Sequence, residues 1–375
     1  MRICSILTTF TSGGAETLVQ NLSRTFTDGG HAASIVAISD AVQVGNPAEV
    51  ERHMRADMEQ GGVTCHSLAL ANRRNVLAGA LALRRVLHEE RPDIIHAHTA
   101  RALPMLALAR PGAPIVLTHH NSKLSFHPRA YWFFDRIVMA YVAISEKALT
   151  QTRLYARAPV RMIMNAASPR FASGTPRTRP PEQPVILAVG TPSEQKDYGT
   201  LIRAAVPLAE QFRAAGRQPP VIRIAGGGAM VEELRSLALQ EGAADLVEFL
   251  GARSDVDALM RKADLFVNSS LWEGFAIAMI EASMSALPIV ATDVAGNHEM
   301  VRPGVNGALV PARDPQALAA AIARVLLDPE GYTALSRGAL NNARRFSIDR
   351  CADEHLRLYR DAMSRNLLAE QRTAA

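Results

Sequence analysis

Two carboxylates lie eight residues apart in LWEGFAIAMIEAS, residues 271–283, a segment that is otherwise mostly apolar. Paired acids can carry out acid/base chemistry on a sugar, as they do in glycosidases. We expect a helix from Gly274 to Ser283, and eight helical residues span about 12 Å along the axis. That length exceeds the roughly 5–9.5 Å that separates glycosidase carboxylates. Glu273 and Glu281 are therefore predicted to hold two ends of one extended ligand instead of acting on one bond.

Backbone amides would lie between the two ends of such a ligand. Those of Gly274 and Phe275 would sit at the positive N-terminus of the predicted helix. The alternative is that Glu273 caps the helix and Glu281 is a solvated helix residue. The apolar residues around Glu281 weaken that alternative, because a carboxylate in an apolar setting needs partners.

Other polar and glycine residues follow predicted strands. Gly13 and Gly14 precede a predicted helix, where glycine lets the backbone approach a ligand and free amides can bind an anion. A plain turn explains this pair equally well. Lys196 follows the predicted strand 185–190 and could reach a phosphate; otherwise it is a solvated surface lysine.

Four histidines close two predicted strands of the first half: His96, His98, His119 and His120. No carboxylate or cysteine joins them at the spacing of metal ligands, so we predict no metal site. We expect instead that one histidine faces the ligand cleft in a catalytic or hydrogen-bonding role, with Asn121 following at the start of a loop.

The elements that must position these residues are short apolar strands alternating with amphipathic helices. Continuous apolar runs are typical of buried parallel strands, and they occur at 2–9, 33–39, 63–69, 93–98, 114–120, 141–145, 160–165, 185–190, 221–226, 246–251, 265–270, 288–293 and 307–312. The Pro-, Ser- and Arg-rich segment 168–184 interrupts the series and is predicted to be a linker. We therefore predict an α/β fold: two Rossmann-like, doubly wound parallel-sheet domains that face each other across a cleft, where ligands bind at the strand ends.

The composition narrows the partners and the compartment. Aromatic residues make up 5% of the chain, which argues against nucleic acid as a partner. Three cysteines without CxxC spacing fit a reducing compartment. The first residues lack the apolar run of a signal peptide, and no 18-residue apolar stretch occurs. We expect a cytoplasmic protein, at most peripheral to the inner face of the cell membrane.

Charge is unevenly distributed along the chain. Residues 1–168 hold 18 Lys/Arg against 12 Asp/Glu, whereas residues 169–375 hold 23 against 24. Within the basic half, FHPRAYWFFDR (126–136) interleaves arginine with aromatic residues. This pattern suggests contact with an anionic membrane surface. An ordinary solvated helix is an equally good explanation.

Several motifs together resemble the retaining, nucleotide-sugar-dependent glycosyltransferases of family four, which have the GT-B fold. They are GGAE near the start, PDIIHAH, THHN, SEQKDYGTLIRA, GGGAMVEELRSLA, the E-x7-E pair and AGNHEMV followed by VNGALVP. The resemblance covers almost the whole chain and is most specific in the second half. It implies an acceptor-binding domain (1–167), a linker (168–184), a nucleotide-sugar-binding domain (185–348), and a C-terminal helix (349–375) that could cross back to the first domain.

The resemblance also implies roles for individual residues. The implied catalytic residues are His120, Glu273 and Lys196. Glu281 would bind the ribose hydroxyls, Glu273 the hydroxyls of the donor sugar, and Lys196 the diphosphate. The remaining implied donor-binding residues are Gly13, Gly14, Thr191, Arg253, Gly274, Phe275 and Ala276. No metal or other cofactor is implied, because protein cations and helix amides would stabilise the leaving diphosphate.

Two positions depart from the family pattern. Thr191 replaces the diphosphate-binding arginine of the GRLxxxK motif and is followed by Pro192, and Asn165-Ala166 replaces the usual Asn-Gly before the linker. Loss of a bidentate guanidinium should weaken phosphate binding. Either another arginine replaces it, or the enzyme is slow, or the chain has a different role.

The expected function is transfer of a hexose from a UDP- or GDP-sugar to an acceptor hydroxyl, with retention of configuration. The expected acceptor is a lipid-linked or saccharide molecule of surface polysaccharide or glycoconjugate biosynthesis. The alternatives are a GT-B nucleotide-sugar epimerase and a catalytically weakened nucleotide-sugar-binding subunit.

Overall fold

The computed structural model describes residues 1–11, 13–71, 75–120, 126–172 and 174–374, with side chains through Leu367. The chain forms two compact units. Unit 1 consists of Met1–Ala166 together with Ile348–Ala375, and unit 2 consists of Ala167–Ser347. Each unit is described by itself.

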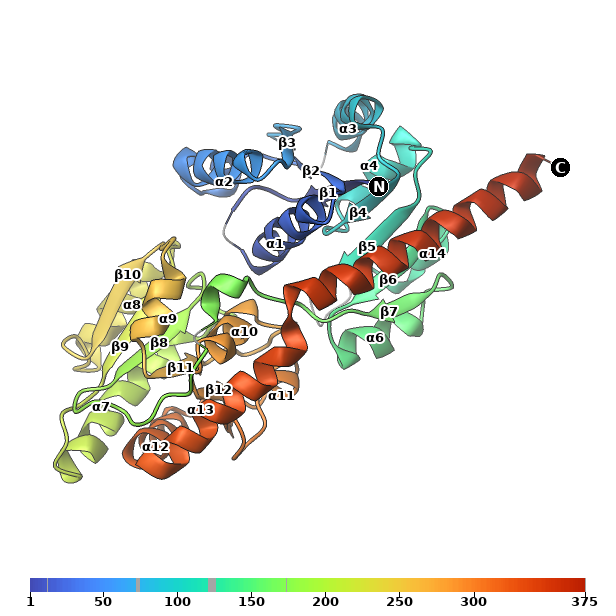
Figure 1. Cartoon of the computed structure of the whole chain (residues 1–375). Helices are drawn as coiled ribbons and strands as arrows, with labels where there is room; N and C mark the ends of the chain where they lie inside the picture. Colours follow the sequence, from blue (N-terminus) through green and yellow to red (C-terminus); the bar gives the residue numbers. More distant parts are fainter. Residues whose placement is uncertain (12, 72–74, 121–125, 173, 375) are drawn as a thin grey trace. The chain divides into compact units, whose positions relative to one another are not determined.

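Unit 1 is built on a seven-stranded parallel sheet with the order β3-β2-β1-β4-β5-β6-β7 (Figure 1). The strands are β1 (Arg2–Leu7), β2 (Ala32–Ala37), β3 (Thr64–Ser67), β4 (Ile94–Ala97), β5 (Ile115–His119), β6 (Val138–Ala143) and β7 (Val160–Met162). The central strands β1, β4 and β5 are buried on both faces, which explains their continuous apolar sequences.

Helices cover both faces of this sheet. They are α1 (Gly14–Asp28), α2 (Ala48–Gln60), α3 (Val76–Glu90), α4 (Ala102–Ala109), α5 (Tyr131–Phe134), α6 (Glu146–Arg153) and α14 (Ile348–Ala374). α3 packs on α4, and α1 packs on α14. The C-terminal helix thus belongs to the unit that the first 166 residues form, and it runs along β5 and β6 (Figure 1).

Unit 2 contains a six-stranded parallel sheet with the order β10-β9-β8-β11-β12-β13. The strands are β8 (Val185–Val189), β9 (Val221–Ala225), β10 (Val247–Gly251), β11 (Leu265–Asn268), β12 (Ile289–Thr292) and β13 (Gly307–Val310). The strand order reverses between β8 and β11, and the loops that follow these two neighbouring strands carry the polar residues described below.

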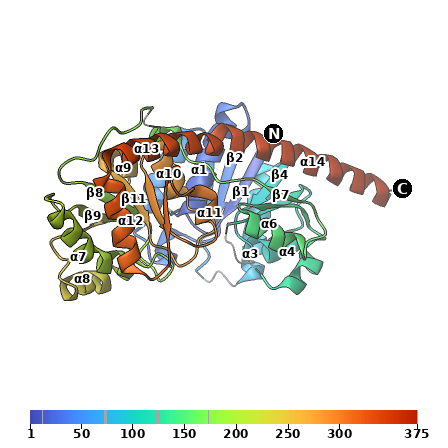
Figure 2. The ribbon, with the colours of Figure 1, turned by 90° about the horizontal axis from the view of Figure 1, so that it is seen from below.

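Two layers of helices enclose the second sheet (Figure 2). α7 (Tyr198–Ala214) packs on α8 (Val231–Gln240) and α12 (Pro315–Leu327). On the other face, α10 (Ile277–Met284) packs on α9 (Val256–Lys262) and α13 (Pro329–Ala343); the short helix α11 spans Asn297–Met300. α12 and α13 begin alike, with Pro in the first turn after a capping aspartate, Asp314 or Asp328, that accepts a backbone N–H.

The predicted fold class, two doubly wound parallel-sheet domains, is confirmed, and each predicted strand corresponds to an observed one. The strand predicted at 141–145 begins three residues earlier, at Val138, because Val138 and Ala140 are also buried against the sheet. The C-terminal helix predicted at 349–375 is observed as α14, Ile348–Ala374.

The segment 168–184 connects the two units and also packs on unit 2. Phe171 is buried, and its carbonyl accepts the hydroxyl of Ser285 at 3.0 Å. Arg177 donates to the carbonyls of Met260 (2.8 Å) and Ser285 (3.3 Å), near the C-terminal ends of α9 and α10. These two side chains anchor a segment whose composition indicated only a linker; Ser173 lies outside the described residues.

Candidate functional site

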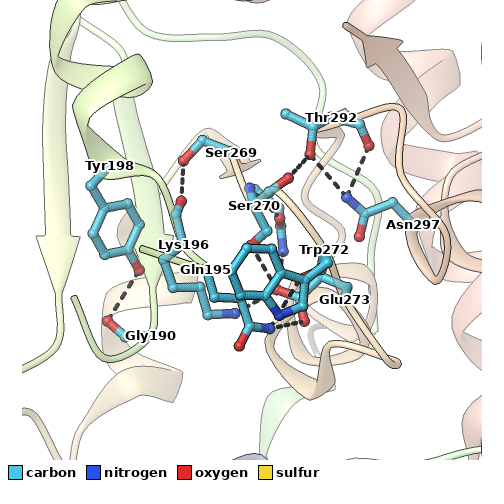
Figure 3. A network of polar contacts seen from close by, with 11 residues as sticks. Gly190, Gln195, Lys196, Tyr198, Ser269, Ser270, Trp272, Glu273, Thr292 and Asn297 are labelled. Carbon is cyan, nitrogen blue, oxygen red and sulfur yellow. Dashed lines mark hydrogen bonds and ion pairs between the residues drawn. The ribbon is translucent and has the colours of Figure 1, made fainter. Parts of the chain in front are cut away.

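Glu273 lies in the loop between β11 and α10 and is 5% exposed. Its Oε1 accepts three hydrogen bonds: from the ammonium of Lys196 at 2.6 Å, from the hydroxyl of Ser270 at 2.7 Å and from the side-chain amide of Asn268 at 3.4 Å (Figure 3). Its Oε2 receives a single described hydrogen bond, from Gln195 at 3.3 Å. Oε1 is therefore saturated, while Oε2 keeps acceptor capacity that a ligand hydroxyl can use.

Gln195 joins the loops that follow the neighbouring strands β8 and β11. Its side-chain amide donates to the carbonyl of Trp272 at 3.0 Å, and its own carbonyl accepts the backbone N–H of Leu271 at 2.8 Å (Figure 3). Ser269 adds a hydroxyl bond to the carbonyl of Lys196 at 2.8 Å. These bonds fix the loops that carry Lys196 and Glu273 relative to each other.

A second set of contacts supports the Glu273 loop from the end of β12. The hydroxyl of Thr292 donates to the carbonyl of Ser270 at 2.5 Å, and Asn297 donates to the carbonyl of Thr292 at 2.9 Å (Figure 3). Gly296 has φ +90°, and a Cβ there would lie 2.9 Å from the carbonyl oxygen of Glu273. Only glycine allows the 273–274 backbone to approach so closely.

Helix α10 begins at Ile277, so the prediction of a helix from Gly274 is wrong by three residues. The loop bonds of Leu271 and the contact with Gly296 keep the preceding backbone out of helical geometry. Gly274, Phe275 and Ala276 consequently lie before the first turn of the helix. The expected span of about 12 Å of helix between the two glutamates does not apply, since half of the interval is loop.

Glu281 lies on α10 and is 6% exposed. Among the described residues, its carboxylate has no hydrogen-bond or ion-pair partner. Burial raises its pKa to about 7, opposed by the charge of Arg170. A buried acid without a partner costs stability when it is ionised, and ligand hydroxyls would supply the missing donors.

The loops after β8 and β9 approach each other through their glycines. A Cβ on Gly226 would lie 2.0 Å from the carbonyl oxygen of Gly190, and one on Gly228 would lie 3.2 Å from the methyl group of Thr191. Thr191 itself is exposed.

Arg253, just after the end of β10, is exposed and forms a bidentate pair with Asp255 (2.8 and 2.6 Å). That pairing partly neutralises the charge of its guanidinium.

Gly13 is the N-cap of α1, and Gly14 is its first residue. A Cβ at Gly13 would lie 2.3 Å from Oε2 of Glu16, so the absence of a side chain leaves room for that carboxylate. Burial raises the pKa of Glu16. The preceding residue, Ser12, lies outside the described residues, as does Asn121.

The four predicted histidines at the ends of β4 and β5 separate into two groups. His119 lies with the aromatic rings of Tyr131 and Tyr141, and burial lowers its pKa to about 4. His120 shares a hydrogen bond of 3.0 Å with His98, between Nε2 and Nδ1, and burial lowers the pKa of His120 to about 3. His120 is therefore neutral near pH 7 and acts there as a hydrogen-bonding group instead of a cation.

Sequence reasoning missed several residues that this geometry includes. Two of them lie on α14: the hydroxyl of Tyr359 shares a 2.6 Å hydrogen bond with His96, and the ring of His355 lies 5.3 Å from that of His96. Gln195, Asn268 and Ser270 were likewise missed as partners of Glu273. Polar residues at neighbouring strand ends were a usable signal for these three. His355 had no such sequence signal, because α14 joins unit 1 only in the folded chain.

Within the described residues, no group of three His, Cys, Asp or Glu side chains could hold a metal ion. No helix in the same residues is long and apolar enough to cross a bilayer.

Comparison with known proteins gives two family matches and several curated relatives. Residues 12–170 match the model of Glycosyltransferase Family 4, and residues 175–342 match that of Glycosyl transferases group 1. The D-inositol 3-phosphate glycosyltransferase of Saccharomonospora viridis is 32% identical over 309 residues, covering 72% of this chain and 70% of that protein. The lipopolysaccharide core biosynthesis glycosyltransferase LpsE of Rhizobium meliloti is 26% identical over 285 residues, covering 74% and 78%.

A solved structure shares the fold. HepE of Anabaena, in complex with UDP and glucose, superimposes with a TM-score of 0.77 at 21% identity, covering 96% of this chain and all of that one.

Proposed function

This chain belongs to the GT-B glycosyltransferases that combine a family 4 domain with a group 1 domain, and we propose that it transfers a hexose from a UDP- or GDP-sugar to an acceptor hydroxyl with retention of configuration. The observation that carries this proposal is Glu281, a buried carboxylate without a partner among the described residues, in the same unit as the Lys196–Glu273 pair. Such a group is suited to accept two vicinal hydroxyls, as a ribose offers.

The other site residues fit the two remaining parts of a nucleotide sugar. Oε2 of Glu273 would accept a hydroxyl of the sugar, while Lys196, held 2.6 Å from Oε1, would face the diphosphate. A preorganised cation stabilises charge on a leaving group without reorganisation. The chain's own cations and amides would then serve where other transferases use a metal, and His120 would orient the acceptor as a neutral hydrogen-bonding group.

The acceptor is proposed to be a saccharide or a lipid-linked molecule of surface polysaccharide or glycoconjugate biosynthesis. Support comes from the basic first half of the chain, which favours an anionic acceptor or membrane, and from a relative named for lipopolysaccharide core biosynthesis. We expect the protein to act on the cytoplasmic side of the membrane.

Thr191 favours a second candidate, a nucleotide-sugar-binding subunit with weak transfer activity. Its exposed methyl and hydroxyl groups supply no charge to the diphosphate, and Lys196 is already partly neutralised by Glu273. In the described part of unit 2, Arg253 does not replace the missing guanidinium, because it is paired with Asp255.

Titration calorimetry with UDP, GDP and ADP and their hexose conjugates tests donor binding. We expect Glu281→Gln to weaken binding of the nucleotide at least tenfold, because the ribose hydroxyls lose an ionised acceptor. Glu273→Gln should leave UDP binding within threefold but abolish the gain that the sugar adds. Glu232→Gln, on the exposed surface of α8, is the matched control.

Product analysis of the same proteins separates the candidates. Transfer to an added acceptor with the donor's anomeric configuration supports the retaining enzyme, binding without turnover supports the weakened subunit, and conversion of the donor to an isomer without acceptor supports an epimerase. If neither glutamate variant alters donor binding, the site assignment is wrong.

A further inference from the structure

Two pairs of large apolar side chains are exposed on unit 1. They are Trp132 (61% exposed), Phe133 (49%), Leu154 (70%) and Tyr155 (44%). Single exposed apolar residues are common, whereas a group of large ones marks an interaction surface. We call these residues, together with Arg129, Arg136, Arg153 and Arg157, the aromatic–arginine patch.

The two segments of the patch lie side by side in the folded unit. The backbone N–H of Arg157 donates to Oδ2 of Asp135, directly after α5, at 2.9 Å. The rings of Tyr131 and Tyr155 stack with their centroids 6.1 Å apart, and Tyr131 is buried beneath the surface. α6, which precedes Leu154, packs on β6 and on the edge strand β7 (Figure 1). The patch is therefore one surface supported by the sheet.

The arginines of the patch are exposed and lack acidic partners. None of the four forms a salt bridge with a described residue, although exposed arginines elsewhere, such as Arg235 and Arg253, do so. The guanidinium of Arg136 lies 3.7 Å from the centroid of the Trp132 ring. Residues 126–157 contain five Lys/Arg and two Asp/Glu, and one of these acids, Asp135, is bound to the backbone of Arg157.

We propose that the aromatic–arginine patch docks on the surface of a bilayer that contains anionic headgroups. Trp and Tyr side chains favour the membrane–water interface, and basic residues close to an anionic membrane surface are attracted to it. A second copy of the chain is a poor occupant, because a twofold contact would bring like charges together.

The patch also connects to the end of β5. The hydroxyl of buried Tyr131 shares a 3.1 Å hydrogen bond with Nε2 of His119, the residue before His120. A bilayer bound to the patch would thus contact the unit that carries the proposed acceptor residue. Only this consequence rests on the proposed function; docking itself does not.

Co-sedimentation of the full chain with vesicles tests the proposal. We expect binding to vesicles of phosphatidylcholine with 30% phosphatidylglycerol at low salt, and at least tenfold weaker binding to pure phosphatidylcholine or in 0.5 M NaCl. Trp132→Ser with Phe133→Ser should reduce binding at least fivefold, as should Arg153→Gln with Arg157→Gln. Leu239→Ser and Arg235→Gln, on the exposed face of α8, are the matched controls and should bind like the wild type.

Several outcomes would overturn the proposal. They are no binding by the wild type, equal binding to both vesicle types, or unchanged binding by both pairs of patch variants. Self-association of the wild type in sedimentation velocity that Trp132→Ser abolishes would show that the patch joins two copies. Donor binding by the wild type is measured without vesicles, and its failure counts against the proposed function and not against docking. Because the patch lies in unit 1, a wild-type Tm and wild-type hydrogen exchange in β5, β6 and β7 show that the variants are folded. Should the aromatic pair fail to fold, the surface arginine pair still decides.

Discussion

At the scale of single residues, the two glutamates of the site differ in what the protein provides for them. Glu273 is buried with an ammonium, a hydroxyl and two amides around it. Glu281 is equally buried, yet the described residues offer its carboxylate no donor. Burial of a charge is tolerated when it is paired and costly when it is not. Glu273 is therefore held in place by its donors, and the proposed role of Glu281 is to accept ligand hydroxyls.

The pKa of Glu281 predicts how stability depends on pH without ligand. Burial raises this pKa from 4.5 to about 7, so between these values the folded protein binds more protons than the unfolded chain. Stability should then fall as the pH rises from about 4.5 to 7, by up to about 3 kcal/mol from this group. Glu281→Gln should remove this pH-dependent contribution to the free energy of unfolding. The Tm of Glu281→Gln relative to that of the wild type should therefore rise as the pH increases from about 4.5 to 7.

Calorimetric unfolding at several pH values between 4.5 and 8 measures the effect, with Glu232→Gln as the exposed control. A Tm difference between Glu281→Gln and the wild type that is constant over the range would contradict the unpaired buried state of Glu281. Saturating donor should reduce the difference, because bound hydroxyls stabilise the ionised form.

At the scale of elements, the site depends on loops that touch at the ends of parallel strands. The loop after β11 is bonded to the loop after β8 through Gln195, and it is supported from β12 through Thr292 and Gly296. With these contacts in place, α10 begins at Ile277 and not at Gly274. The interval between the two glutamates is consequently part loop and part helix, and its geometry depends on three loops together.

Gly296→Ala tests this close approach, and Gly304→Ala is its control. Both glycines have positive φ, at +90° and +75°, but a Cβ at Gly296 would lie 2.7 Å from the carbonyl oxygen of Gly274, whereas one at Gly304 meets open space. Both variants should lose about 1 kcal/mol to backbone strain. Gly296→Ala should lose more and should also weaken donor binding, because the backbone of Glu273 must move. Equal effects of the two variants on Tm and on donor affinity would show that the close approach is unimportant.

At the scale of the whole molecule, unit 1 is completed by the end of the chain. α14 packs on α1 and along β5 and β6, and it buries Tyr359 and His355. The hydroxyl of Tyr359 shares its hydrogen bond with His96 on β4, and its ring lies 6.0 Å from that of Phe26 on α1. The first 166 residues therefore do not complete unit 1 without α14.

Removal of α14 should destabilise unit 1 and leave unit 2 folded. We expect truncation after Ser347 to speed hydrogen exchange in β1, β4, β5 and β6, while exchange in β8–β13 stays within a few fold of the intact protein. Tyr359→Ala is a milder variant, with an expected loss of about 3–5 kcal/mol in unit 1. Leu367→Ala, which is exposed, should behave like the wild type. Faster exchange confined to unit 2 would contradict the assignment of α14.

The sequence by itself determined the local patterns of this protein. Continuous apolar runs predict buried parallel strands because both faces of such strands are covered, and this gave the fold class and each strand position to within a few residues. Glu273 and Lys196 could be selected because polar residues at strand ends stand out against apolar surroundings. Glu281 could be selected because its apolar neighbours on a helix imply burial.

Only the tertiary structure decided which of these residues meet. The bond of 2.6 Å between Lys196 and Glu273 spans 77 positions, and that between His96 and Tyr359 spans 263. The hydrogen bonds of Gln195 and the position of Gly296 are not visible in any local pattern, since each depends on loops from different strands. The start of α10 was mispredicted for the same reason. Local propensity is a short-range property, whereas the partners of a buried charge are set by packing across the whole unit.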